Sequence, residues 1–166
     1  MVNTALLERI IGCKIKEYKV FEKVDIDSPH GIYIYDKSED KWIYVDAERD
    51  VFIPKHDGIY IIYFDNTKCP ACRVYDIYWF PYVSLLGSSL ENVYFVIILC
   101  EWFARNCRSR IASNTFKYFE IHASPTTLLL CIKNGEVTDQ DKVEGVKTMD
   151  KLASIVEEFA RKNGFM

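Results

Sequence analysis

The stretch that decides the fold is FDNTKCPACRVY, residues 64–75. It begins at the end of a nearly all-apolar segment, residues 59–64, which is typical of a strand covered on both faces of a parallel sheet. Beyond the second cysteine, apolar residues recur at helical spacing and predict a helix over about 72–83. Cys69 and Cys72 therefore stand where a buried strand passes into a helix. Such a pair can be a redox couple, half of a metal site or a coincidence of composition.

The predicted helix contains an internal proline and a wide apolar surface. Pro81 lacks the N–H that an internal helical residue donates, so we expect a kink or an early end there. The face expected to pack on the sheet consists of Val74, Ile77, Tyr78 and Pro81. The aromatic residues indicate core and surface cover, because no basic stripe accompanies them as it would in a nucleic-acid platform; they are Tyr75, Tyr78, Trp79, Phe80 and Tyr82.

The elements on either side of this stretch follow from their hydrophobic periods. Residues 4–11 predict a short helix, and residues 31–46 predict a hairpin that turns at 37–40. Downstream, a second buried strand completes a right-handed parallel crossover. The dipeptide Asn134-Gly135 is the strongest short-range hairpin signal in the chain. The downstream elements are a strand at 93–100, a short helix near 113–119, strands at 126–132 and about 138–144, and a terminal helix at 148–162.

This order of elements carries three motifs: Cys69-Pro70-Ala71-Cys72, the proline-led segment IHASPTTLLL with Pro125, and KNGEV followed by Gly145 and a helix. Together they resemble the thioredoxin family over about residues 59–162. The resemblance implies an α/β chain with a three-layer α/β/α fold and a mixed central sheet, to which the helix and hairpin predicted from the sequence pattern of residues 1–58 add an N-terminal extension. We divide the chain into an extension at 1–58, packed on the same domain, and a thioredoxin-like core at 59–166.

Two departures from the family pattern bear on the site. The central dipeptide is Pro70-Ala71 rather than Gly-Pro, which leaves the reducing or oxidising direction open. Tyr63 stands where the family often has a buried acid, and Asp65 would share its strand face two residues later. Residues 1–58 match the family's first elements poorly, so they form an added cap, a docking surface or a remodelled sheet edge.

The resemblance assigns unequal roles to the two cysteines. Cys69 at the helix tip would be the exposed attacking thiol, because free backbone N–H groups and the helix dipole stabilise its anion. Pro70 would occupy the first turn, where a missing N–H costs nothing, and Lys68 would add positive charge. Cys72, one turn further in, would be the shielded resolving thiol. These residues suit thiol-disulfide exchange.

Three further residues are expected to support that chemistry. Asp65 is the nearby carboxylate that could accept the Cys72 proton; the alternative is a solvated loop acid. Pro125, if its peptide bond is cis, would turn the Ser124 backbone toward Cys69 to pair with an extended substrate; the alternative is a trans turn proline. The burial of Asp65 and the isomer of the Ser124-Pro125 bond distinguish these alternatives.

The remaining cysteines pose a separate question. Cys100 ends a predicted strand on the side where Cys69 should lie, and Cys107 follows in an insertion rich in arginine. They form a possible second pair, either stabilising or redox-active; the alternative is a buried free thiol and a solvated loop. Cys13 and Cys131 read as small hydrophobic residues. The arginines of the insertion are Arg105, Arg108 and Arg110, and the three histidines, expected at surfaces or turns, are His30, His56 and His122.

Composition and charge limit which partners, location and cofactors we expect. Lys plus Arg number 21 against 24 Asp plus Glu, for a net charge of −3, so we expect no nucleic-acid and no membrane partner. Charged residues interrupt the first 20 positions, which favours a cytoplasmic location over secretion. Zinc would need a second metal-ligand pair that the sequence lacks, so we expect neither metal nor cofactor.

We predict a thiol-disulfide oxidoreductase that acts on protein disulfides or dithiols through Cys69 and Cys72 and is recycled by a reductase. The alternative is a binding or adaptor module of the same fold, whose cysteines act only as a redox latch.

Overall fold

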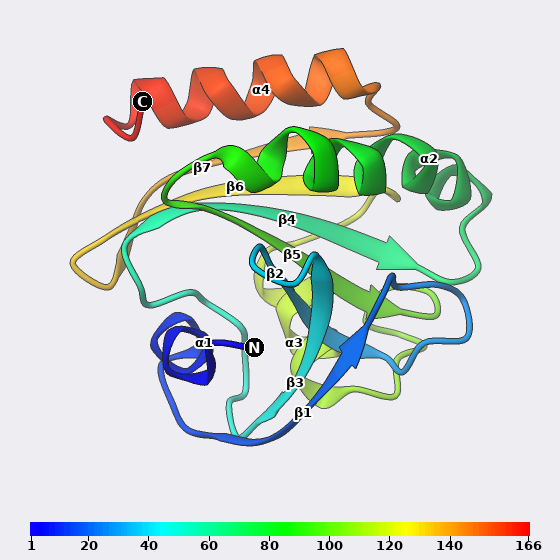
Figure 1. Ribbon diagram of the computed structural model, residues 1–166. Coiled ribbons are helices and arrows are strands. Elements are labelled where there is room, and N and C mark those ends of the chain that lie inside the picture. The colour runs from blue at the N-terminus through cyan, green and yellow to red at the C-terminus, as the bar shows by residue number, and fades with distance from the viewer.

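A seven-stranded mixed sheet forms the middle layer of the computed structural model, which describes residues 1–166 (Figure 1). Its strands are β1 (Ile15–Phe21), β2 (Gly31–Asp36), β3 (Lys41–Ala47), β4 (Gly58–Asn66), β5 (Val93–Cys100), β6 (Thr126–Lys133) and β7 (Glu136–Glu144). They lie in the order β1-β3-β2-β5-β4-β6-β7. Only β4 and β5 pair in parallel. The mixed sheet predicted from the resemblance is confirmed.

Helices cover both faces of this sheet. They are α1 (Thr4–Ile11), α2 (Pro70–Leu85), α3 (Arg110–Tyr118) and α4 (Met149–Lys162), with a short 3-10 turn at Gly87–Ser89. Helices α2 and α4 lie on one face, and α1 and α3 lie on the other (Figure 1). None of the four is long and apolar enough to cross a membrane. The three-layer arrangement matches the prediction.

Strand β4 carries the centre of the molecule, because every one of its residues is buried. Its side chains alternate between the two hydrophobic cores, so the strand must be apolar on both faces. Tyr63 packs edge-on against Trp79 of α2, with ring centroids 5.2 Å apart. On the opposite face, Phe64 packs against Phe116 of α3 at 5.0 Å. The predicted doubly covered strand is confirmed.

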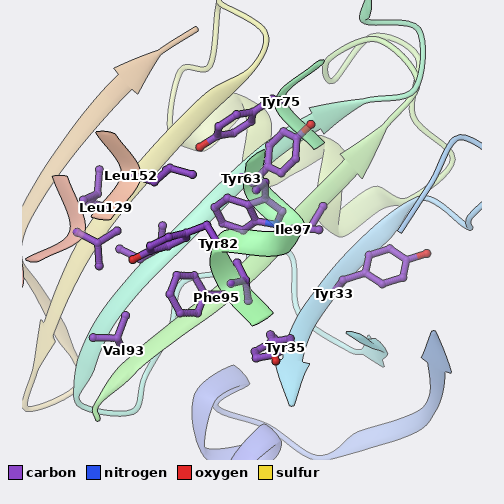
Figure 2. Packing of buried hydrophobic residues seen from close by; sticks show 14 of the residues in the cluster. Tyr33, Tyr35, Tyr63, Tyr75, Tyr82, Val93, Phe95, Ile97, Leu129 and Leu152 are labelled. Carbon is purple, nitrogen blue, oxygen red and sulfur yellow. The ribbon is translucent and has the colours of Figure 1, made fainter. Parts of the chain in front are cut away.

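The predicted packing face of α2 is wrong. Of the four residues on that face, Val74 is 47% and Ile77 66% exposed, and Tyr78 and Pro81 are only half-buried. The buried face is the aromatic one, and Figure 2 shows Tyr63, Tyr75, Tyr82 and Phe95 gathered in this core. Large rings remove more apolar area from water than aliphatic side chains do, so the aromatic face wins. Its buried members are Cys72, Tyr75, Trp79, Tyr82 and Val83.

Of the two outcomes predicted at Pro81, a kink or an early end, the early end is wrong, because the helix continues past Pro81 to Leu85. Pro81 denies a hydrogen bond to the carbonyl group of Ile77, four residues earlier. Ile77 is mostly exposed, so water can bind that carbonyl. A solvent-facing proline is therefore tolerated inside the helix.

Residues 1–58 widen the sheet instead of standing apart from it. The predicted hairpin of β2 and β3 is present, with Asp36 opposite Lys41. Strand β2 pairs antiparallel with β5, and β1, which was not predicted, adds a final strand beside β3. This segment is therefore a remodelled sheet edge with α1 on one face. A division of the chain at residue 58 stays a prediction.

The C-terminal hairpin also follows the prediction. Asn134 and Gly135 both have positive φ, at 54° and 75°, as a tight two-residue turn requires. The flanking residues Lys133 and Glu136 are paired. The first strand of this hairpin begins at Thr126, which pairs with Phe64 near the end of β4, so Pro125 lies next to that strand end.

Candidate active site

Cys69 caps the N-terminus of α2. Its backbone is extended, with φ −104° and ψ 109°, so the helix begins at Pro70. The backbone N–H of Cys72 donates to Cys69 Sγ at 3.1 Å. An oriented N–H and the positive end of the helix both favour a thiolate at this sulfur. Pro70 occupies the first helical position, where its missing N–H costs nothing.

Cys69 is only 4% exposed, so the prediction of an exposed thiol is wrong. The chain just before it is drawn inward by two backbone hydrogen bonds. Thr67 N–H donates to Cys100 O at 2.9 Å, and Lys68 N–H donates to Glu101 O at 3.2 Å. The chain that leads into Cys69 is thus tied to the segment that follows β5.

Cys72 is fully buried one turn further in. Its Sγ lies 3.1 Å from Ser124 Oγ. Burial and, next in size, the charge of Asp65 raise the pKa of this thiol, while the Ser124 hydroxyl lowers it. Both cysteines are free thiols in the structure. Cys72 is therefore a neutral thiol that needs a base before it can react.

Ser124, which precedes Pro125, lies against Cys72. The peptide bond between Ser124 and Pro125 is cis, and Pro125 is buried. The Ser124 hydroxyl accepts a hydrogen bond from Asn66 Nδ2 at 2.8 Å. Sequence reasoning placed only the Ser124 backbone at the site. The structure adds its hydroxyl, which contacts Cys72.

Asp65 lies in β4 and is fully buried, so the alternative of a solvated loop acid is wrong. Its Oδ1 accepts a hydrogen bond from Arg73 Nη2 at 2.7 Å, and its Oδ2 has no hydrogen-bond partner. Burial, followed by the charge of Asp76, raises the pKa of Asp65 to about 7, against the lowering effect of Arg73. This carboxyl can therefore exchange a proton near neutral pH.

Arg73 and Asp76 belong to the site, although sequence reasoning did not assign them. Arg73 Nε donates to Asp76 Oδ2 at 3.0 Å, and Tyr63 Oη lies 2.8 Å from Asp76 Oδ1 and 3.1 Å from the carbonyl oxygen of Cys72. The i,i+3 spacing of Arg73 and Asp76 was a detectable signal. Burial and the two carboxylates hold the pKa of Tyr63 well above its ordinary value, so its phenol stays neutral.

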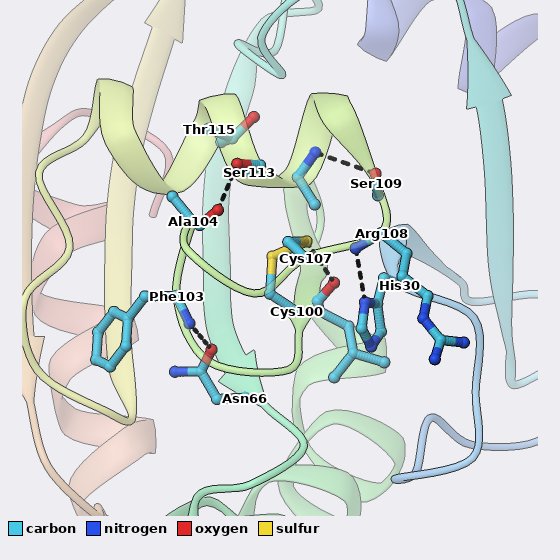
Figure 3. The surroundings of a disulfide bond; sticks show 12 residues. His30, Asn66, Cys100, Phe103, Ala104, Cys107, Arg108, Ser109, Ser113 and Thr115 are labelled. Carbon is cyan, nitrogen blue, oxygen red and sulfur yellow. Dashed lines mark hydrogen bonds between the residues drawn. A yellow bond between two sulfur atoms is a disulfide. The ribbon is translucent and has the colours of Figure 1, made fainter.

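Asn66 connects the cysteines to the neighbouring loop and was also missed. Its Oδ1 accepts the Phe103 backbone N–H at 2.6 Å (Figure 3). Its Nδ2 reaches Ser124, which in turn contacts Cys72. A fully buried asparagine at a strand end needs such partners, because unpaired buried amides are costly.

A disulfide closes the loop that Asn66 holds. Cys100 and Cys107 are bonded, with their Cα atoms 4.6 Å apart. Figure 3 shows the loop between β5 and α3, where His30 Nδ1 accepts the Arg108 backbone N–H at 3.0 Å. The structure thus brings this second pair together, and a free thiol at Cys100 is not observed.

The other predicted residues lie at the margins of the site or outside it. Lys68 is 70% exposed and forms an ion pair with Glu101 at 3.7 Å, so its charge is partly offset. Cys131 is buried in the core on the α2 side of the sheet. Cys13 is partly exposed beside the opposite core. Arg105 and Arg108 are exposed, and Arg110 pairs with Asp50 at 3.2 Å.

Metal ligands do not gather anywhere in the structure. No group of three or more His, Cys, Asp or Glu side chains is arranged to hold a metal ion.

Solved structures similar to this chain are thioredoxins. The thioredoxin from Aeropyrum pernix superposes with a TM-score of 0.54 and 16% identity, over 81% of this chain and 98% of the other. Trichomonas vaginalis thioredoxin superposes with a TM-score of 0.45 and 15% identity, over 61% of this chain and 79% of the other. Mitochondrial thioredoxin 3 from Saccharomyces cerevisiae superposes with a TM-score of 0.41 and 20% identity, over 63% of this chain and 81% of the other. No protein-family model and no curated protein sequence matches the chain. The chain has a thioredoxin-like α/β fold, with a Cys-x-x-Cys pair at the start of α2.

Proposed function

We propose that this protein is a thiol-disulfide oxidoreductase that exchanges protein disulfides through Cys69 and Cys72 without a bound cofactor. One observation carries the proposal: two free thiols share a helix N-terminus but have different surroundings. Cys69 Sγ accepts a backbone N–H, whereas Cys72 is buried between Ser124 and a buried acid. A redox pair needs this asymmetry, whereas a structural bridge uses both sulfurs alike.

The attack step uses Cys69. Its thiolate attacks one sulfur of a substrate disulfide, and the other substrate sulfur leaves as a thiolate that takes a proton from water. A mixed disulfide between Cys69 and the substrate results. The Cys72 N–H and the helix N-terminus both point at the sulfur that carries the thiolate during attack.

The resolving step uses Cys72 and Asp65. The Cys72 thiol gives its proton to the Asp65 carboxylate, and the new thiolate attacks Cys69 Sγ. The bond between Cys69 and the substrate breaks, and the second substrate thiolate leaves. Two electrons have then passed from the cysteine pair to the substrate, and Cys69 and Cys72 are joined as a disulfide.

An extended substrate segment would bind beside Ser124. Neither the N–H nor the C=O of Ser124 forms a hydrogen bond within the chain, so both can pair with a substrate backbone. The partners proposed are protein disulfides or dithiols, together with a reductase that returns the pair to its thiol form. The cytoplasmic location expected from the sequence stays a prediction.

The alternative function is a binding module whose cysteines act as a redox latch. The small exposure of Cys69 favours it, because a substrate sulfur must reach a thiol that is 4% exposed. Reduction of insulin by dithiothreitol separates the two functions. An oxidoreductase at micromolar concentration should shorten the lag before insulin precipitates, and Cys69→Ser should abolish the effect. A wild-type protein no faster than Cys69→Ser would support the binding module.

A further inference from the structure

Two carboxylates share a single guanidinium group behind the cysteine pair. Arg73 extends Nη2 to Asp65 at 2.7 Å and Nε to Asp76 at 3.0 Å. Asp65 is fully buried, whereas the side chains of Arg73 and Asp76 are 30% and 20% exposed. Arg73 and Asp76 also line a surface pocket with Lys23, Val24 and Phe80. The network therefore runs from the surface to the buried acid.

The charges in this network do not balance. Two ionised carboxylates would carry −2 against the +1 of Arg73, inside a region where water screens charge poorly. Lys23, in the loop after β1, faces Asp76 and offsets part of its charge. Asp25 of the same loop lines the same pocket and adds a negative charge there. Tyr63 offers only a neutral hydroxyl to Asp76. The single positive charge of Arg73 therefore has to offset the charges of both Asp65 and Asp76.

We propose that Arg73 and Asp76 are positioning residues that set, in opposite directions, the pH range in which Asp65 accepts the Cys72 proton. Arg73 favours the ionised Asp65 and fixes Oδ1, which leaves Oδ2 as the oxygen without a partner. Asp76 opposes it by charge repulsion, although it accepts from a different nitrogen of the same guanidinium, Nε. This inference rests on the proposed function of the cysteine pair.

The proton is conserved through the cycle. It passes from Cys72 to Asp65 when Cys72 attacks Cys69. When a dithiol reductant later opens the Cys69–Cys72 bond by attacking Cys69, Cys72 leaves as a thiolate and takes the proton back from Asp65. Arg73 stays protonated throughout and transfers no proton, because its guanidinium does not titrate in proteins.

The test separates the two chemical steps with a chromogenic aromatic disulfide. Reduced protein releases one coloured thiolate on attack by Cys69 and a second when Cys72 resolves the mixed disulfide. All variants carry Cys13→Ser, since Cys13 is the one free cysteine that is not buried. The rate of the second phase is measured from pH 5.5 to 9. The midpoint of its rise reports the protonation of Asp65.

The two substitutions should move that midpoint in opposite directions. Asp76→Asn removes a negative charge that repels the ionised Asp65 and should lower the midpoint by about one pH unit, whereas Arg73→Gln removes the offsetting positive charge and should raise it by about one unit or more. Arg73→Lys keeps the charge but cannot span both carboxylates, so an intermediate rise is expected. Asp139→Asn, which removes an equal charge from the exposed ion pair with Lys162, should leave the midpoint unchanged.

A direct titration guards against a variant that fails to fold or a rate limited elsewhere. The carboxyl 13C resonance of Asp65, assigned by its loss in Asp65→Asn, should titrate at lower pH in Asp76→Asn than in the wild type. Unchanged midpoints, or shifts in the same direction for Asp76→Asn and Arg73→Gln, would overturn this inference while the oxidoreductase function stood. Absence of any second phase in the wild type would instead refute the function itself.

Discussion

Asp65→Asn should stabilise the protein, and the gain should grow as the pH rises. The folded state raises the pKa of Asp65 from its ordinary value of 3.8 to about 7, chiefly because the carboxyl is buried. A carboxyl whose pKa is higher in the folded state contributes stability below pH 4 and loses it as the pH rises toward 7. An asparagine of the same shape does not titrate and avoids this loss.

The magnitude follows from the two pKa values. They differ by about 3, and each unit corresponds to about 1.4 kcal/mol, so ionising Asp65 costs the folded state about 4 kcal/mol above pH 7. Part of that cost is already incurred at pH 4.5, where the unfolded chain has released the proton. Between pH 4.5 and pH 8 the advantage of Asp65→Asn should therefore grow by about 3 kcal/mol.

Urea unfolding at the two pH values measures this difference, with both proteins in the same redox state. The hydrogen bond from Arg73 that Asp65→Asn alters is present at both pH values, and the ion pair that forms only as Asp65 ionises is already included in its folded-state pKa. The change between the two values therefore isolates the titration. Asp139→Asn is the control, because a hydrogen bond from Asn163 holds the pKa of that half-buried acid below its ordinary value. Relative to the wild type, Asp139→Asn should lose a little stability between pH 4.5 and pH 8, where Asp65→Asn gains it. If the stability advantage of Asp65→Asn over the wild type changes by less than about 0.5 kcal/mol between pH 4.5 and pH 8, Asp65 is not a buried acid with a pKa near 7.

Three further predictions concern the surroundings of the site. Replacing both Cys100 and Cys107 by alanine should lower the free energy of unfolding by about 2 kcal/mol, as expected for a bridge of sequence separation 7, and an unchanged urea midpoint would contradict it. Ser124→Ala removes the hydroxyl that lowers the pKa of Cys72, so the second phase of thiolate release should slow while the first phase keeps its rate. Equal slowing of both phases would argue against that role. Tyr82→Phe should leave the free energy of unfolding in urea unchanged or raise it by up to about 1 kcal/mol, since the buried hydroxyl has no hydrogen-bond partner. A decrease of more than about 1 kcal/mol would show that the hydroxyl does form a hydrogen bond.

The core of the fold could be predicted because its signals are local. The motif at Cys69–Cys72, the all-apolar run of β4 and the Asn134-Gly135 turn each specify their structure within a few residues. Strand β1 carries no such signal. Five of its seven residues are exposed and none is fully buried, so its sequence lacks the alternation that a half-buried strand shows.

The buried face of α2 and the ion pairs of Arg73 could not be predicted from the sequence, because both depend on contacts between separate elements. Both faces of α2 are apolar, so periodicity alone cannot say which one the sheet covers, and the choice depends on rings from β4 and β5. The pairing of Arg73 with Asp65 crosses from a helix to a strand. Its formation depends on how deeply α2 lies on the sheet, which is a property of the packed core.

The central claim is that Cys69 attacks and Cys72 resolves, and trapping of a mixed disulfide tests it most directly. Each single serine variant is mixed, in reduced form, with a protein substrate that contains one disulfide, and the products are weighed by intact mass spectrometry. Cys72→Ser should accumulate one covalent substrate per chain, which dithiothreitol releases, because attack proceeds and resolution cannot. Cys69→Ser should trap almost none, since Cys72 is buried and neutral. Equal trapping by both variants, or trapping by neither, would contradict the assignment of the two thiols.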